Sequence, residues 1–188
     1  MGDSNIPLMI IAVVVVLAVV GAIIGVIFYR NRRKTVLKDQ FGPEYEHTVQ
    51  EMGDVHKAQA ELEARKKHVE SLDIHSLTEI QRERYLADWT AVQSKFVDEP
   101  GKAIVDADHL IIEVMQLRNY PVSDFEQRAA DISVQYPDLV TNYRAARLIA
   151  IKNEQQQADT EELRQAMIYY RSLFEELLET EKVSVKEN

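Results

Sequence analysis

A run of apolar residues near the start of the chain constrains its structure more than any other feature. Residues 6–29 read IPLMIIAVVVVLAVVGAIIGVIFY and contain no charged side chain. Because a helix rises about 1.5 Å per residue, this run would extend about 36 Å, whereas the hydrocarbon core of a bilayer is about 30 Å thick. The run therefore predicts a transmembrane helix after a short external N-terminus, residues 1–5.

The charges on either side of the run favour a retained membrane anchor over a cleaved signal peptide. A signal peptide carries positive charge before a shorter apolar region, whereas here Asp3 precedes the run and basic residues follow it. These basic residues are Arg30, Arg32, Arg33, Lys34 and Lys38. Basic residues beside a span stay on the cytoplasmic side and can face anionic lipid, so we expect the N-terminus outside and the rest inside. An exported C-terminal domain, the alternative, would carry these five cations across the membrane.

Beyond the basic segment the chain is acidic. The whole sequence has a formal charge of −9, and residues 35–188 contain 18 basic and 30 acidic residues, which gives −12. Anionic lipid would repel such a domain, so we expect it to stand off the bilayer. The charge also argues against a nucleic-acid partner, because phosphate binding needs a basic face. The absence of cysteine excludes disulfides, thiolate catalysis and cysteine zinc sites.

Two glycines in the apolar run define a candidate helix-dimer face. Gly21 and Gly25 lie four positions apart. This spacing leaves a shallow groove in which a second transmembrane helix can approach closely. The pattern predicts a homodimer, although glycine is also common in spans that do not associate.

The segment after the anchor is predicted to be helical. Residues 30–43 form a basic juxtamembrane segment that ends in Phe41-Gly42-Pro43, a sequence that interrupts helices. Residues 44–71 read as one long helix, in which five of eight heptad positions are apolar. This coiled-coil pattern is marginal. A solvated helical stalk, a dimer seam and a helix that packs back on its own domain all remain open.

Residues 72–180 are predicted to form a compact bundle of about five helices, so the fold class is all-α, and residues 181–188 are expected to be a disordered tail. Capping boxes mark three helix starts, at Thr78 with Gln81, Ser123 with Glu126 and Asp159 with Glu162. The expected helices start at Thr78, about Lys102, Ser123, Asp138 and Asp159, and the first two end near Val97 and Arg118. No segment outside the apolar run alternates with the period of a strand.

The helix expected at about Lys102–Arg118 has the broadest apolar face and should be the most buried. Its inward residues are Ile104, Ala107, Leu110, Ile111, Val114, Met115 and Leu117. The same helix carries Asp106, His109 and Glu113 about one turn apart. These three side chains are the basis of an alternative function, a membrane-tethered hydrolase or metalloenzyme. A polar rim on an amphipathic helix is the competing interpretation, and the sequence favours it. No catalytic or phosphate-binding motif is present, and we expect no cofactor.

Aromatic and basic residues near the C-terminus define a candidate partner surface. They are Tyr143, Arg144, Tyr169 and Arg171. Tyrosine and arginine are the residues that most often anchor protein interfaces. A core with a rim of tyrosines is the competing interpretation.

Several segments together also carry a family likeness. They are FGPEYEHTV (41–49), LDIHSLT (72–78), ADWTAVQSKFVDEP (87–100), YPVSDFEQRAADISVQYP (120–137), NYRAAR (142–147) and TEELRQAMIYYRSLFEELL (160–178). In these segments the chain resembles a widespread, uncharacterised family of bacterial single-pass membrane-anchored proteins with a small C-terminal helical domain. The resemblance implies a bacterial source and a location in the cell (inner) membrane. It implies no reaction, cofactor or catalytic residue.

These observations together predict a membrane-anchored helical interaction or scaffold module. It would act at the cytoplasmic face of a bacterial membrane and bind a protein partner there. Tethering would raise its effective concentration for partners at the same surface.

Overall fold

The computed structural model describes residues 20, 21, 28, 32 and 34–179, and all regular structure in these residues is helical. The all-α prediction is therefore confirmed for this part of the chain. The chain divides into two units, Met1–Gln40 and Phe41–Asn188. In the first unit, residues 34–40 are helical. No helix within the described residues is long and apolar enough to cross a membrane. Most of the predicted span, and the predicted tail, lie outside these residues.

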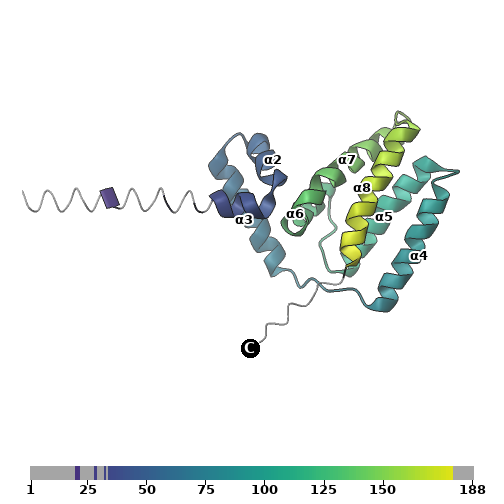
Figure 1. Ribbon diagram of the computed structural model, residues 1–188, viewed down its shortest axis with the longest axis horizontal. Helices are drawn as coiled ribbons and strands as arrows, with labels where there is room; N and C mark the ends of the chain where they lie inside the picture. The colour runs from purple at the N-terminus through teal and green to yellow at the C-terminus, as the bar shows by residue number, and fades with distance from the viewer. Residues whose placement is uncertain (1–19, 22–27, 29–31, 33, 180–188) are drawn as a thin grey trace, which may run out of the picture. The chain divides into compact units, whose positions relative to one another are not determined.

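The second unit contains seven helices within its described residues (Figure 1). They are α2 (Pro43–Met52), α3 (Val55–Ser71), α4 (Glu79–Lys95), α5 (Pro100–Leu117), α6 (Phe125–Gln135), α7 (Pro137–Glu154) and α8 (Thr160–Leu178). The last five are the five helices predicted for residues 72–180.

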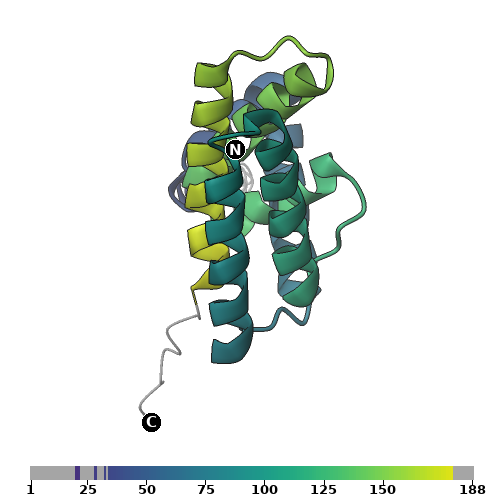
Figure 2. The same ribbon diagram turned by 90° about the vertical axis from the view of Figure 1, so that its right-hand side faces the viewer.

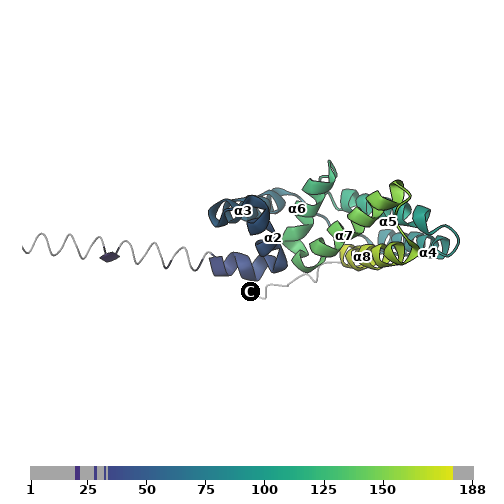
Figure 3. The same cartoon turned by 90° about the horizontal axis from the view of Figure 1, so that it is seen from above.

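The seven helices are arranged as a series of neighbours rather than in chain order. Helix α5 packs against both α4 and α8, and α8 packs against α7; Figure 2 shows α4, α5 and α8 side by side. Helix α6 packs against α7, and the hairpin formed by α2 and α3 packs on α6 and α7. The hairpin and α4 therefore lie at opposite ends of this unit (Figure 3).

The main core forms where α4, α5, α7 and α8 meet. Ile104, Ile111 and Met115 of α5 are fully buried, as the broad apolar face predicted. From α4, Trp89 stacks on Phe174 of α8 with ring centroids 4.6 Å apart. Only the end of the predicted face is wrong: Leu117, at the last turn of α5, is 36% exposed.

The single long helix predicted for residues 44–71 is wrong. The chain breaks at Gly53, whose φ of 63° places it in the left-handed region that ends helices. The next residue, Asp54, caps α3 by accepting hydrogen bonds from the backbone N–H groups of His56 at 2.8 Å and Lys57 at 2.9 Å. Since α2 and α3 pack on α6 and α7, the segment belongs to the compact unit and is not a separate stalk.

Two of the three predicted capping boxes are confirmed by their hydrogen bonds. Thr78 with Gln81 and Asp159 with Glu162 form complete capping boxes. The predicted cap at Ser123 is wrong by one residue, because Asp124 accepts the hydrogen bond from the N–H of Gln127. The remaining starts shift by one or two residues because Pro100 and Pro137 occupy the first turns of α5 and α7. Proline fits there, since its missing N–H has no partner in the first turn.

The position of α5 gives a stability prediction. Ile111 is fully buried between neighbouring helices, whereas Ile80 at the start of α4 is 81% exposed. We expect Ile111→Ala to lower the free energy of unfolding by about 2–5 kcal/mol, because it removes buried methyl groups and leaves a cavity. The matched control, Ile80→Ala, should stay within about 0.5 kcal/mol. Urea unfolding followed by circular dichroism measures both, and equal losses would contradict this core.

Candidate functional site

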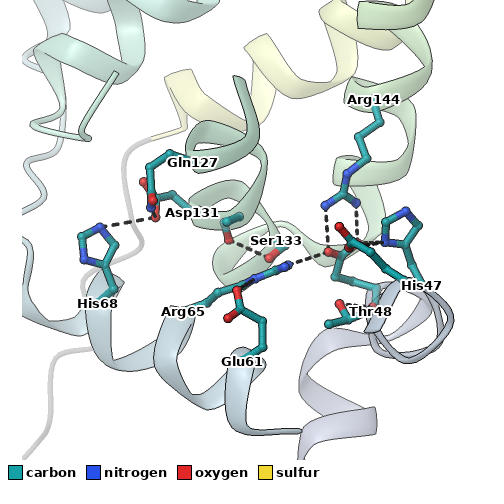
Figure 4. Close-up of polar contacts among 12 residues, drawn as sticks. His47, Thr48, Glu61, Arg65, His68, Gln127, Asp131, Ser133 and Arg144 are labelled. Atoms are coloured by element: carbon teal, nitrogen blue, oxygen red, sulfur yellow. Dashed lines mark hydrogen bonds and ion pairs between the residues drawn. The ribbon is translucent and has the colours of Figure 1, made fainter. Parts of the chain in front are cut away.

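The hairpin and the bundle meet through polar side chains. The apolar residues buried within the hairpin, Phe41, Tyr45, Ala58 and Leu62, are separate from the cluster that forms the main core. Between the two apolar regions lie charged and polar side chains of α2, α3, α6 and α7, which we call the polar seam (Figure 4). Its residues are Glu44, Thr48, Arg65, His68, Gln127, Asp131 and Arg144.

Glu44 is the centre of the polar seam. Its side chain is fully buried and accepts hydrogen bonds from two guanidinium groups. Arg144 of α7 donates through Nη1 at 2.5 Å and through Nη2 at 2.9 Å, and Arg65 of α3 donates through Nη1 at 2.8 Å. One carboxylate thus connects three helices.

The electrostatics of Glu44 favour its charged form. Burial by itself would raise the pKa of this carboxyl group, but the hydrogen bond and charge of Arg144, together with the charge of Arg65, outweigh burial and hold the pKa below its usual value of 4.5. Arg65 also donates a second hydrogen bond, from Nε to Glu61 at 2.9 Å. The Glu44 carboxylate is therefore ionised and paired at neutral pH.

Asp131 forms a second, less complete part of the polar seam. Its side chain is fully buried, and Oδ1 accepts a hydrogen bond from Nε2 of Gln127 at 2.8 Å. His68 Nε2 lies 3.6 Å from the same oxygen. Neither Asp131 Oδ2 nor His68 Nε2 has a hydrogen-bond partner. Burial raises the pKa of Asp131 above its usual 3.8, and the hydrogen bond from Gln127 and the charges of His68 and Arg65 offset only part of this effect.

A pocket of about 440 Å³ opens beside the polar seam. Both halves of the seam contribute to its walls: α2 and α3 provide Glu51, Glu61 and Arg65, whereas the bundle provides Asp124, Glu126 and Arg144. The two arginines are already bonded to Glu44. Glu44 offsets one of these two positive charges, and Glu61 is paired with Arg65. The carboxylates that line the pocket still outnumber its guanidinium groups, so a positively charged group is favoured in this pocket.

The structure does not bring the predicted partner surface together. Tyr143 is fully buried rather than at a surface; it accepts a hydrogen bond from Arg128 Nε at 3.2 Å, and burial raises its pKa to about 12. Arg144 belongs to the polar seam. Tyr169 is partly buried against the core, and Arg171 is exposed and paired with Glu175 at 2.7 Å. Of the four, Arg144 is the one that lines the pocket beside the seam.

The predicted metal ligands do not converge either. Asp106 pairs with Lys95 of α4 at 2.5 Å, and His109 and Glu113 are exposed. Among the residues that the structure describes, no three His, Cys, Asp or Glu side chains are close enough to hold a metal ion. These side chains fit the polar rim that was the competing interpretation.

The structure describes only part of the predicted helix-dimer face and of the basic cluster. Gly25 of the helix-dimer face and two residues of the basic cluster, Arg30 and Arg33, lie outside the described residues. Gly21, Arg32, Lys34 and Lys38 are described. The dimer face and the contact with lipid therefore stay predictions.

The raised pKa of the buried Asp131 gives a prediction for how stability depends on pH. Burial raises the pKa of Asp131 in the folded chain above the value of 3.8 that is usual for an aspartate. The free energy of unfolding therefore decreases as pH rises from 3.8 through the raised pKa, because the carboxyl group then ionises in a buried position. Asp131→Asn removes this loss and can still accept the hydrogen bond from Gln127. We expect the variant to be more stable than the wild type at about pH 7, with the difference shrinking toward about pH 4.

Urea unfolding of the wild type and the variant across this pH range measures the effect. Glu126→Gln is the matched control, because Glu126 is an exposed carboxylate on the same helix. A difference between wild type and Asp131→Asn that stays constant with pH would contradict the raised pKa.

Comparisons with family models, with curated proteins and with solved structures found no match to this chain. The resemblance to bacterial membrane-anchored proteins therefore stays a prediction from the sequence. The function has to be inferred from the polar seam and its pocket.

Proposed function

We propose that the chain is a membrane-tethered binding module whose pocket receives a positively charged segment of a protein partner. The observation that carries this proposal is the pocket of about 440 Å³ lined by Glu51, Glu61, Asp124 and Glu126. Pockets that bind ligands commonly enclose about 300–1,000 Å³. A lysine or arginine side chain on an exposed peptide segment has a suitable size and charge.

The arrangement of charges supports a cationic ligand over an anionic one. Arg144 directs both of its terminal nitrogens at Glu44, and Arg65 divides its hydrogen bonds between Glu44 and Glu61. An anion entering the pocket would have to compete with these carboxylates. A cation meets carboxylates on both walls of the pocket, and the acidic composition of residues 35–188 would also attract it from a distance.

The membrane anchor would favour partners at the membrane over partners elsewhere in the cell, even if the pocket binds them weakly. In this proposal residues 6–29 span a bacterial cell membrane once, the basic cluster faces its cytoplasmic side, and the acidic domain lies in the cytoplasm. Confinement to the membrane raises the effective concentration of the module for partners held on the same surface. A charged pocket of modest affinity is then sufficient for an adaptor or scaffold.

The pocket can be tested with a lysine-rich peptide and the full-length chain in nanodiscs of zwitterionic lipid. The pocket variant combines Glu51→Gln with Glu126→Gln, both exposed side chains. Exposed ion pairs contribute about 0.2–1 kcal/mol each, so we expect the double variant to raise the Kd for the peptide by roughly three- to tenfold. Fluorescence anisotropy at low and physiological salt measures the affinity.

The matched control removes two carboxylates elsewhere, with Glu83→Gln on α4 and Glu176→Gln on α8, both exposed. We expect it to change the Kd by less than about twofold, because screening weakens distant charges. Equal effects of the two double variants would show that total charge, and not the pocket, attracts the peptide.

The topology can be tested separately, because the chain has no cysteine. Ser4→Cys places a single thiol before the apolar run, and Gln157→Cys places one between α7 and α8. With the N-terminus outside, a maleimide that cannot cross membranes should label only the Ser4→Cys variant in cells whose inner membrane is intact. Labelling of Gln157→Cys under the same conditions would reverse the proposed orientation.

A further inference from the structure

We infer that the α2–α3 hairpin is a releasable arm, which docks on α6 and α7 through Glu44 and detaches as one unit while helices α4–α8 stay folded. Docking of the arm would form the pocket and release would take it apart, because the arm and the bundle each provide one of its walls. The link to a bound ligand rests on the proposed function. The release of the arm does not.

The packing separates the arm from the bundle. The buried apolar side chains of α2 and α3, such as Tyr45 and Leu62, pack outside the main core cluster, whose members come from residue 72 onward. Within the arm, Gln59 Nε2 donates to Tyr45 Oη at 3.0 Å, so α2 and α3 are also joined by a buried hydrogen bond. Regions with their own contacts can open as separate cooperative units.

Glu44 controls the docking more than any other side chain of the polar seam. It is the one fully buried carboxylate in the described seam that bonds to two different helices besides its own. Without the charge of Glu44, Arg144 would lose the ion pair that it forms across the seam. The side chains of Arg65 and Arg144 are only 11% and 18% exposed. A buried charge that loses its partner strongly destabilises the contact that buries it.

The rest of the polar seam holds the arm less firmly. Asp131 of α6 is faced by His68 and Arg65 of α3 and by Gln127 of its own helix. Its Oδ2 atom and Nε2 of His68 have no hydrogen-bond partner. Unsatisfied buried groups reduce the free energy gained by docking, so this contact does not replace the Glu44 contact when that is lost.

The connection between α3 and α4 limits the movement to the arm. Three hydrogen bonds fix this connection to the end of α5: Asn119 Nδ2 to the carbonyl of Asp73 at 3.0 Å, and a pair between His75 and Arg118. Arg118 also donates to Tyr136 Oη and to the carbonyl of Leu177. The arm can therefore move about the residues just before Asp73 without disturbing α4.

Hydrogen exchange of the full-length chain in nanodiscs tests the release. In Glu44→Gln we expect the amides of α2 and α3 to exchange roughly a hundredfold faster than in the wild type, and those of α5 and α8 to keep their protection. Glu51→Gln is the control, because it makes the same change at an exposed position of α2. Equal loss of protection in the arm and the bundle, or no change in the arm, would overturn the inference.

A second variant excludes a general failure to fold. Glu44→Leu combined with Arg144→Met replaces the ion pair between α2 and α7 by apolar side chains, while Arg65 keeps Glu61. Such replacements often preserve a contact, so protection of α2 and α3 should return toward the wild-type level. Protection that stays as low as in Glu44→Gln would show that the unpaired guanidinium group of Arg144 is not what releases the arm, and would overturn the role given to this ion pair.

Exchange measured with the lysine-rich peptide tests the release of the arm and the proposed ligand separately. If the peptide binds in the pocket of the wild type, it should slow exchange in α2 and α3, because it contacts both walls and binds only the docked state. Release in Glu44→Gln without any peptide binding to the wild type would support the arm and overturn the proposed ligand. Binding that leaves exchange in α2 and α3 unchanged would overturn the coupling.

Discussion

A buried carboxylate is tolerated only where its loss of hydration is compensated, and this condition determines how the α2–α3 hairpin meets the bundle. Glu44 has no exposure to solvent, so it needs both Arg65 and Arg144 within hydrogen-bonding distance. Because these three residues lie on α2, α3 and α7, one electrostatic requirement fixes the position of the hairpin on the bundle. An apolar contact of the same area would tolerate sliding, whereas a bidentate ion pair does not.

The pocket follows from the same requirement. Side chains that pair across the polar seam are long and do not fill space as an apolar core does, so a cavity remains beside them. Arg65 and Arg144 reach Glu44 and leave carboxylates such as Glu51 and Glu126 around the opening. The acidic pocket and the docked hairpin are thus two consequences of one arrangement.

Features that depend on neighbouring residues were predictable from the sequence. Thr78 and Gln81 cap α4 with two local hydrogen bonds. Tyr85 and Trp89 lie four positions apart on the same helix, so helical spacing alone places both on the face that is buried. Gly53-Asp54 carried a comparable local signal for the end of one helix and the start of the next, yet the heptad pattern across it favoured a continuous helix. The pair of Glu44 and Arg144, by contrast, joins residues 100 positions apart. No local pattern indicates such a pair, which is why Arg144 was assigned to a partner surface.

Two buried carboxylates of the polar seam respond to pH in opposite directions. Glu44 has a lowered pKa, so its contribution to docking is present above its usual pKa and is lost as pH falls through the folded-state value. Asp131 has a raised pKa, so its unfavourable ionisation appears as pH rises and is relieved as pH falls. The two effects partly cancel on acidification. On acidification the contact between arm and bundle therefore weakens at Glu44, while the unfavourable charge of the buried Asp131 is removed.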